Sequence, residues 1–325
     1  MKALVTGATG FVGGHLVDAL VARGDTVLAL ARRPATHAAL TARGATPVPG
    51  SLEHEDSLAA ALSGVEVVYH LAGLTAARDE AEFLAVNEAG TQRLIHAIRD
   101  AAPALRRLVH VSSQAALGPS PRGTPLDEEA ECRPITSYGR SKLAGERAVR
   151  ASGLPWTVIR PPAVYGPGDR EFLRIFQIVR RGIAPVFGSG TQGLSLVFVR
   201  DLVRVIALAG SQAAASGQIL HAAHPEIVLS REVARAAGAA IGRTPLIVPL
   251  PAFLAAPIVG LIGRAAAATG RRTVVNADKM AEFLAPSWLL AVAKAEQLLG
   301  WRAGTDVAAG MRMTAEWYRE HQWLP

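Results

Sequence analysis

A glycine-rich turn near the start of the chain constrains its fold more than any other segment. Residues 5–13 read VTGATGFVG, which places Gly7, Gly10 and Gly13 between a short apolar run and a helix-like stretch. Glycines are needed in such a turn because the backbone bends sharply, approaches a pyrophosphate closely and packs the helix onto the strand. The free N–H groups at the start of the helix then face the phosphates. The turn predicts a dinucleotide-binding unit, although three glycines alone are also compatible with an ordinary loop.

A second string narrows the chemistry. Residues 138–142 read YGRSK, so Tyr138 and Lys142 lie four residues apart and share one face of a helix. A phenol has an unperturbed pKa near ~10 and is a poor acid or base at neutral pH. A nearby ammonium favours the phenolate, which brings the pKa of the phenol toward the working range. The pair therefore predicts a tyrosine that transfers protons, supported by a lysine.

Short apolar runs alternate with helix-like stretches through the first half of the chain. We expect strands at 3–5, 26–31, 46–49, 65–70, 108–112, 156–160 and, later, 196–199, and helices at 12–23, 57–62, 91–100 and 138–151. This alternation predicts an α/β fold with a doubly wound parallel sheet, of the Rossmann type. We expect 1–165 to form this domain, with chain returns around 194–220. Residues 166–325 are expected to form mainly a smaller C-terminal substrate lobe.

Composition limits the partners. The 325 residues carry a net charge of +7 from scattered arginines, which favours anionic small ligands over nucleic acid. Cys132 is the single cysteine; it excludes an internal disulfide and, with no signal peptide visible, favours a cytoplasmic location. His70, His110 and His221 lack carboxylate or cysteine partners at ligand spacing, so we expect no metal site.

One segment, 252–263 (AFLAAPIVGLIG), is strongly apolar. It is too short to cross a bilayer, so we expect no stable membrane span. A buried helix of the second lobe is the favoured interpretation, and a helix facing lipid or substrate is the alternative.

Further motifs follow in order: HLAG at 70–73, VNEAGT at 86–91, VSSQAALG at 111–118 and RPPAVYGPG at 160–168. With these the chain resembles the extended short-chain dehydrogenases/reductases, over about residues 1–210. The resemblance implies catalytic roles for Ser113, Tyr138 and Lys142, with Ser113 bound to the substrate oxygen and Lys142 also holding the nicotinamide ribose. It implies cofactor contacts, besides the three glycines and the Tyr–Lys pair, at Thr9, Phe11, Val12, Ser51, Leu52, Leu71, Ala72, Gly73, Asn87, Pro161 and Val164. Asn87 is alternatively a structural helix cap.

The end of the second strand bears on the choice of cofactor. Enzymes that use NAD commonly place an acidic residue there for the ribose 2′-hydroxyl, whereas this chain has Ala31 followed by Arg32 and Arg33. Guanidinium groups suit a 2′-phosphate, so NADP(H) is favoured over NAD(H). At the third strand the family often has Gly-Asp-Leu, and here Ser51 replaces the aspartate.

Three reactions compete within this fold. Dehydratases of the family carry an Asp-Glu pair where this chain has Gln114 and Ala115, so elimination lacks its acid and base. Epimerases usually carry an arginine seven residues before the aspartate that matches Asp201, and Leu194 occupies that place.

The favoured function is an NADP(H)-dependent oxidoreductase that interconverts a carbonyl and an alcohol on a fairly apolar small molecule. A nucleotide-sugar epimerase is the alternative, with Arg170, Arg174 or Arg200 replacing the missing clamp. The second alternative is a non-catalytic regulator that binds the dinucleotide. A homodimer through the helices at 91–100 or 138–151 is compatible with the resemblance.

Overall fold

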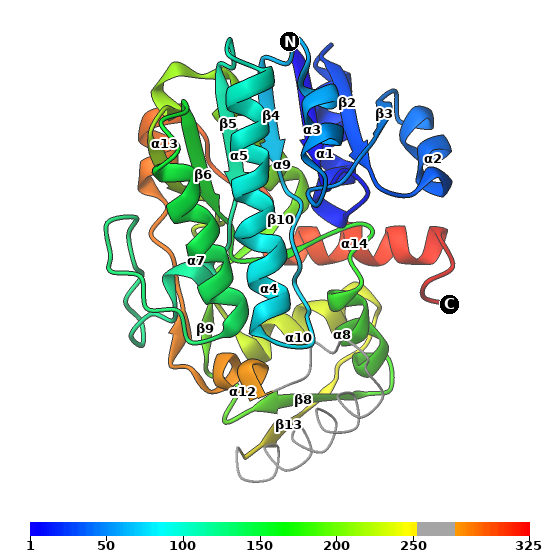
Figure 1. Cartoon of the computed structure of the whole chain (residues 1–325). Coiled ribbons are helices and arrows are strands. Elements are labelled where there is room, and N and C mark those ends of the chain that lie inside the picture. Colours follow the sequence, from blue (N-terminus) through cyan, green and yellow to red (C-terminus); the bar gives the residue numbers. More distant parts are fainter. Residues whose placement is uncertain (252–276) are drawn as a thin grey trace.

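Seven parallel strands form the central sheet of the protein, in the order β11-β6-β5-β4-β1-β2-β3 (Figure 1). The computed structural model describes residues 1–251 and 277–325, so the apolar segment 252–263 lies outside the described residues. The strands are β1 (Lys2–Thr6), β2 (Thr26–Ala31), β3 (Thr46–Pro49), β4 (Val67–His70), β5 (Arg107–Val111), β6 (Trp156–Arg160) and β11 (Gln218–His221).

Helices cover both faces of this sheet. One face is packed by α1 (Phe11–Ala22) and α9 (Val199–Ser211), and the other by α3 (Glu55–Leu62), α5 (Ala89–Ala101) and α7 (Ser137–Arg150). Figure 1 shows α5 and α7 in front of the sheet and α9 behind it. The predicted doubly wound α/β fold is confirmed. The remaining elements around the sheet are η1 (Pro34–Thr36), α2 (His37–Ala42), α4 (Glu80–Asn87), α6 (Gln114–Leu117), η2 (Ala213–Ala215) and α13 (Ala293–Leu299).

The strand order reverses between β1 and β4, whose chain connections run to opposite sides of the sheet. In doubly wound sheets the ligand binds outside the carboxyl ends of the strands at this reversal. The glycine turn follows β1 and the HLAG segment follows β4, so the two motifs meet at that point.

A smaller lobe lies beyond the carboxyl ends of the strands. It contains three small sheets, β10–β7, β12–β9–β14 and β13–β8, and a core of aromatic and aliphatic side chains that includes Tyr165, Phe176 and Tyr318. Its elements are β7 (Ala163–Tyr165), α8 (Glu171–Val179), β8 (Ile183–Phe187), β9 (Gly193–Leu194), β10 (Leu196–Phe198), β12 (Val228–Leu229), α10 (Ser230–Ala240), β13 (Leu246–Leu250), α12 (Ala277–Leu284), β14 (Ser287–Trp288) and α14 (Val307–Glu320).

The chain passes repeatedly between sheet and lobe. It leaves the sheet after β6, returns as α9 and β11, leaves again for β12, α10 and β13, and returns once more as α13, which packs on α9 and β11. Among the described residues, no helix is both long and apolar enough to cross a membrane.

Candidate active site

The glycine turn has a conformation that only glycine fits at two positions. Gly7 has a positive φ of 74°, and a Cβ there would lie 2.7 Å from the backbone nitrogen of Ala72. A Cβ on Gly13 would lie 2.1 Å from the carbonyl oxygen of Gly7. Gly10 immediately precedes α1 and has no side chain that could cap the helix. The helix N-terminus therefore presents free N–H groups close to the backbone of the turn, which fits the pyrophosphate of a dinucleotide.

A pocket of about 440 Å³ at the carboxyl ends of β2 and β3 fits the adenosine end of the cofactor. Arg32 and Ser51 both line it, together with His54 and Ser57. Arg33 is not among the lining residues; its carbonyl oxygen accepts hydrogen bonds from Thr36. Leu52 is buried and packs into the core beneath the pocket. The structure thus brings Arg32 and Ser51 together at this pocket, whereas Arg33 and Leu52 do not line it.

Asn87 supports the loop after β4. Its Oδ1 accepts from the backbone N–H of Leu74 at 2.8 Å, and its Nδ2 donates to the carbonyl oxygen of Leu74 and to the hydroxyl of Ser141. A Cβ on Gly73 would lie 2.9 Å from Oδ1 of Asn87 and 3.8 Å from Nζ of Lys142. The expectation of a helix cap is wrong, because Asn87 ends α4 and Glu88 precedes α5. Its amide instead joins the HLAG loop to α7.

The three predicted catalytic residues lie on the turn after β5 and in the first two turns of α7. Thr136 caps α7 by accepting from the N–H of Gly139, and a Cβ on Gly139 would lie 2.3 Å from the carbonyl oxygen of Ala115. This close approach lays the start of α7 against the turn after β5, and a hydrogen bond joins the hydroxyl groups of Ser113 and Tyr138. Lys142, one turn further along α7, is 6% exposed and donates from Nζ to the carbonyl oxygen of Val111 at 2.7 Å.

Burial dominates the titration of both side chains of the Tyr–Lys pair. It raises the pKa of Tyr138 to about 12, with the charge of Glu282 acting in the same direction and the hydrogen bond from Ser113 opposing it. It lowers the pKa of Lys142 to about 8, opposed by the carboxylate of Glu146. This is opposite to the lowering of the phenol pKa that the sequence predicts, because the ammonium donates to Val111 and the phenol is desolvated. Tyr138 is accordingly a proton donor at neutral pH.

A buried ion pair lies beneath the catalytic helix. Glu146 of α7 and Arg160 of β6 are 2.6 Å apart, with their side chains 0% and 1% exposed. The hydroxyl of Ser112 donates to Glu146, and Nη2 of Arg160 contacts the sulfur of Cys132 at 3.2 Å. Ser112 is thereby committed to the interior, whereas Ser113 faces Tyr138.

The rings of His70 and His110 lie side by side, with their centroids 5.2 Å apart, and both are close enough to Lys142 for its charge to act on them. His70 joins the hydroxyls of Thr6 and Thr91, at 2.7 and 2.9 Å. Because the hydroxyl of Thr91 donates to the carbonyl oxygen of Asn87, Nε2 of His70 carries the proton and Nδ1 accepts from Thr6. Both nitrogens of His110 are buried without a hydrogen-bond partner.

This pair makes the stability of the protein sensitive to acid. Burial, reinforced by the charge of Lys142, lowers the pKa of His70 to about 3 and that of His110 well below its usual value. In the unfolded chain both titrate near ~6.5, so the unfolded state binds more protons and stability falls as the pH drops below that value. The slope is about 1.4 kcal/mol per pH unit for each histidine.

We expect His110→Leu to remove the contribution of one histidine, so the free energy of unfolding should fall less steeply as the pH drops. Urea unfolding between about pH 7 and pH 5 measures this slope. His96→Gln, at an exposed position of α5, is the control and should leave the slope as it is. An unchanged slope in His110→Leu would contradict the assignment.

The other predicted contacts occupy varied places. Thr9 is exposed in the turn, Phe11 packs edge-on against His15, and Leu71 and Val164 pack against the core. The carbonyl oxygen of Pro161 accepts from the N–H of Gln114. Two residues near Tyr138 were not predicted: the ring of Phe83 lies 5.8 Å away, and Glu282 reaches it from α12. Within the described ranges, no group of His, Cys, Asp and Glu side chains could hold a metal ion.

Comparisons with known proteins agree on this architecture. The model of the NAD dependent epimerase/dehydratase family matches residues 3–223. The chain is 31% identical to the ceramide reductase of Caulobacter vibrioides over 323 residues, covering 99% of this chain and 95% of that protein. It is 38% identical, over 53% of each chain, to a 4-hydroxy-2-methyl-3-oxo-4-farnesyl-3,4-dihydroquinoline-1-oxide ketoreductase of Stigmatella aurantiaca. The solved structure of MoeE5 in complex with UDP-glucose and NAD superimposes with a TM-score of 0.79 at 28% identity, covering 99% of this chain and 100% of that one.

Proposed function

The chain belongs to the NAD-dependent epimerase/dehydratase family, and we propose that within it the protein is an NADP(H)-dependent oxidoreductase that interconverts a ketone and an alcohol on an apolar, lipid-like substrate. The observation that carries the choice of substrate is the place of Leu194. Leu194 lies in β9 and pairs with Val228 of β12 and Trp288 of β14. An apolar side chain between apolar neighbours occupies the position at which epimerases hold a diphosphate.

Two of the three arginines that could replace the clamp have partners elsewhere, and the third is exposed on α9. Arg170 stacks over the ring of Trp323 at 5.3 Å, and Arg174 pairs with Glu171 at 3.2 Å. Arg200 is exposed at the start of α9, where its charge acts on His15 of α1. None of these contacts supports a diphosphate pocket beside Leu194, which weighs against a nucleotide sugar as substrate.

Two relatives support the same choice. The names of the Caulobacter vibrioides and Stigmatella aurantiaca proteins describe reduction on a ceramide and on a ketone with a farnesyl chain. Both names combine a reductase with a long apolar group. We transfer this substrate class, and no particular molecule, to the present chain.

The residues of the site divide the work of reduction. The nicotinamide cofactor supplies the hydride when bound. Ser113 accepts from the N–H of Ala115 at 3.1 Å, and its own O–H donates to the oxygen of Tyr138, which is the direction that lowers the pKa of the phenol. The O–H of Tyr138 is then left to donate to the substrate oxygen and to protonate it as negative charge develops there. Lys142, held by the carbonyl oxygen of Val111 and close to Gly73, would hold the nicotinamide ribose. In oxidation the proton moves the other way.

A substrate panel tests the proposal. NADPH consumption should be seen with long-chain and polycyclic ketones, and no interconversion of UDP-glucose and UDP-galactose should be detected by chromatography. Epimerisation without net consumption of NADPH would contradict the reductase. Tight cofactor binding with no turnover of any compound would instead favour a regulator.

The preference for NADP(H) has its own test. Because Arg32 lines the adenosine pocket, Arg32→Ala should weaken NADPH binding by about 10- to 100-fold, the loss of one charged hydrogen-bonded contact. NADH binding should change little, since it has no 2′-phosphate. Fluorescence titration with both cofactors measures this, and Arg33→Ala, outside the pocket, is the matched control. Equal weakening of NADH and NADPH by Arg32→Ala would exclude a phosphate contact.

A further inference from the structure

The two-stranded ribbon β8–β13 has apolar side chains on its outer as well as its inner face. Ile183 of β8 lies opposite Leu246 of β13, and they are 45% and 68% exposed. The next pair on the same face is Pro185 opposite Val248. A surface ribbon ordinarily alternates apolar residues inward with polar residues outward. An outer row of Ile, Leu, Pro and Val therefore calls for an apolar partner.

The inner face of the ribbon is covered by helices of the lobe. Ala184 and its partner Ile247 face α8 and α10, where they pack with Val179 and Ala234. Among the residues that the structure describes, no hydrophobic core includes Ile183, Leu246 or Val248 of the outer row.

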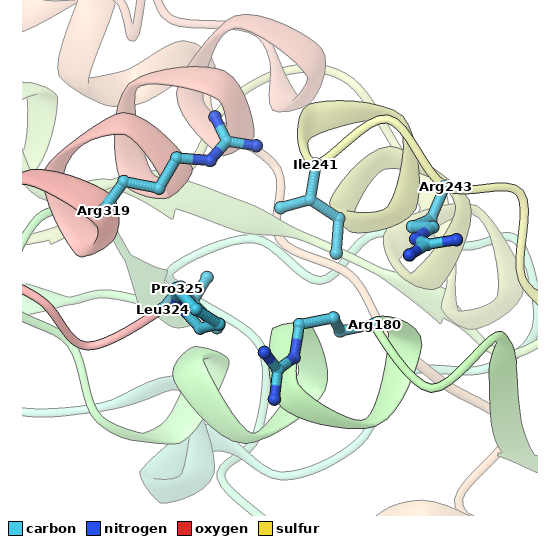
Figure 2. Close-up of a pocket in the computed structure, with 6 residues that line it drawn as sticks. All are labelled: Arg180, Ile241, Arg243, Arg319, Leu324 and Pro325. Atoms are coloured by element: carbon cyan, nitrogen blue, oxygen red, sulfur yellow. The ribbon is translucent and has the colours of Figure 1, made fainter.

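Arginines flank one end of this row. Arg180 precedes Ile183 by three residues, and Arg243 precedes Leu246 by the same interval. Together with Arg319 of α14 they line a pocket of about 250 Å³, and Figure 2 shows the three side chains coming from separate elements around Ile241. The backbone hydrogen bond from Leu246 to Gly182 joins the two arginine-bearing segments directly.

Among the described residues, these guanidinium groups are not paired with acidic side chains: neither Arg180 nor Arg243 nor Arg319 forms an ion pair with a carboxylate. Arg319 donates to the carbonyl oxygen of Ala240 at the end of α10, which accounts for one of its five N–H groups. Positive charge next to an exposed apolar row is the combination that binds an anionic lipid surface, with the apolar residues in the interface and the guanidiniums on the phosphates.

We propose that the outer face of the β8–β13 ribbon, with Arg180, Arg243 and Arg319 beside it, docks the protein on a bilayer that carries anionic headgroups. The net charge of +7 favours approach to such a surface. The proposed docking is inferred from this face of the ribbon and does not depend on the proposed function. Only its role rests on that function, in which the bilayer is the source of a lipid-like substrate.

The far end of the ribbon leads toward the active site. Phe187, the last residue of β8, stacks on Phe283 with ring centroids 4.3 Å apart. Phe283 follows Glu282 in α12, and Glu282 lies close enough to Tyr138 to act on its titration. The outer row thus extends through Phe187 to Phe283, next to the residue whose charge acts on Tyr138, which is the direction that a substrate from a bilayer would take.

Sedimentation with vesicles tests the docking without any substrate. The protein should bind vesicles of equimolar phosphatidylcholine and phosphatidylglycerol and should stay in the supernatant with phosphatidylcholine alone. Arg180→Glu/Arg243→Glu and Ile183→Glu/Leu246→Glu should each lower the bound fraction by about tenfold or more. Arg122→Glu/Arg150→Glu, at exposed positions outside the lobe, changes the net charge as much as the first variant and should bind like the parent protein. NADPH binding checks that every variant is folded.

Four results would overturn the proposal, three of them from the sedimentation itself. These three are failure of the parent protein to bind the anionic vesicles, binding that survives in both test variants, and an equal loss in the control variant. Release by inorganic phosphate at constant ionic strength would also overturn it, because the arginines would then bind a soluble anion. Ketone reduction is measured separately, so a failure of docking leaves the proposed reaction standing, and the reverse holds too.

Discussion

Replacing Tyr138 with phenylalanine is expected to lower kcat for ketone reduction by about 10²- to 10⁴-fold, the usual contribution of one general acid. The substitution removes the hydroxyl that Ser113 orients and keeps the ring that packs against Phe83. Cofactor binding should therefore change little, and the loss should fall on kcat. Steady-state NADPH oxidation with a ketone found in the substrate panel, together with a fluorescence titration of NADPH, measures both quantities.

A matched substitution controls for the loss of a buried hydroxyl. Tyr69 is also buried, and its hydroxyl contacts the carbonyl oxygen of Ala207 on the far side of the sheet from α7. Tyr69→Phe removes the same atom and should leave kcat as it is. If Tyr138→Phe retained the kcat of the parent protein, the proton would have to come from another group, or the protein would not be a reductase.

The second large effect is expected on stability. Glu146→Ala leaves the guanidinium of Arg160 buried without its carboxylate, and breaking a buried pair in this way costs about 3–5 kcal/mol. The free energy of unfolding, from urea denaturation followed by tryptophan fluorescence, should fall by that amount. Ser112 also loses its hydrogen-bond acceptor, which adds to the cost.

Two further variants separate charge burial from a general weakness of α7. Glu80 of α4 forms an exposed ion pair with Arg140 of α7. Glu80→Ala removes this pair and should lower the free energy of unfolding by about 1 kcal/mol or less. Glu146→Leu/Arg160→Met removes both charges and should recover most of the lost stability, because no charge is then left uncompensated. A cost of Glu146→Ala no greater than that of Glu80→Ala would show that the pair does not stabilise the fold.

Local patterns in the sequence predicted the sheet well. The strands expected at 26–31, 46–49 and 156–160 have those bounds, and the other expected strands and helices differ by one or two residues at an end. These segments are long apolar runs or clear helical repeats, so the signal lies within each segment. The strand β11 was not predicted, since its four residues acquire a place in the sheet only by pairing with β6. The helix α4 was also missed, because it buries only Phe83 and Asn87 and has a weak apolar period.

The sequence motifs predicted which residues form the candidate site, but they did not predict the burial, hydrogen bonds and charges around those residues. Ser113 and Tyr138 meet because a short turn and the start of one helix carry them, and Lys142 lies one turn further along the same helix; such local relations survive in the sequence. The pKa of Tyr138 depends on burial and on Glu282, which reaches it from an element 144 residues further along the chain. The role of Asn87 depends on a loop and on Ser141, which only the tertiary fold brings together. Contacts of this kind have no signature in a single sequence.

The repeated passage of the chain between sheet and lobe has a consequence for evolution and engineering. A lobe formed from one continuous segment could be exchanged between relatives with two cuts, as a module. Here the chain enters the lobe at three separate points, at β7, at β12 and at α14, and it returns to the sheet between them, first as α9 and β11 and then as α13. A chimera would need a junction at every crossing, so changes of substrate in such a chain are more accessible through point substitutions within the lobe than through recombination.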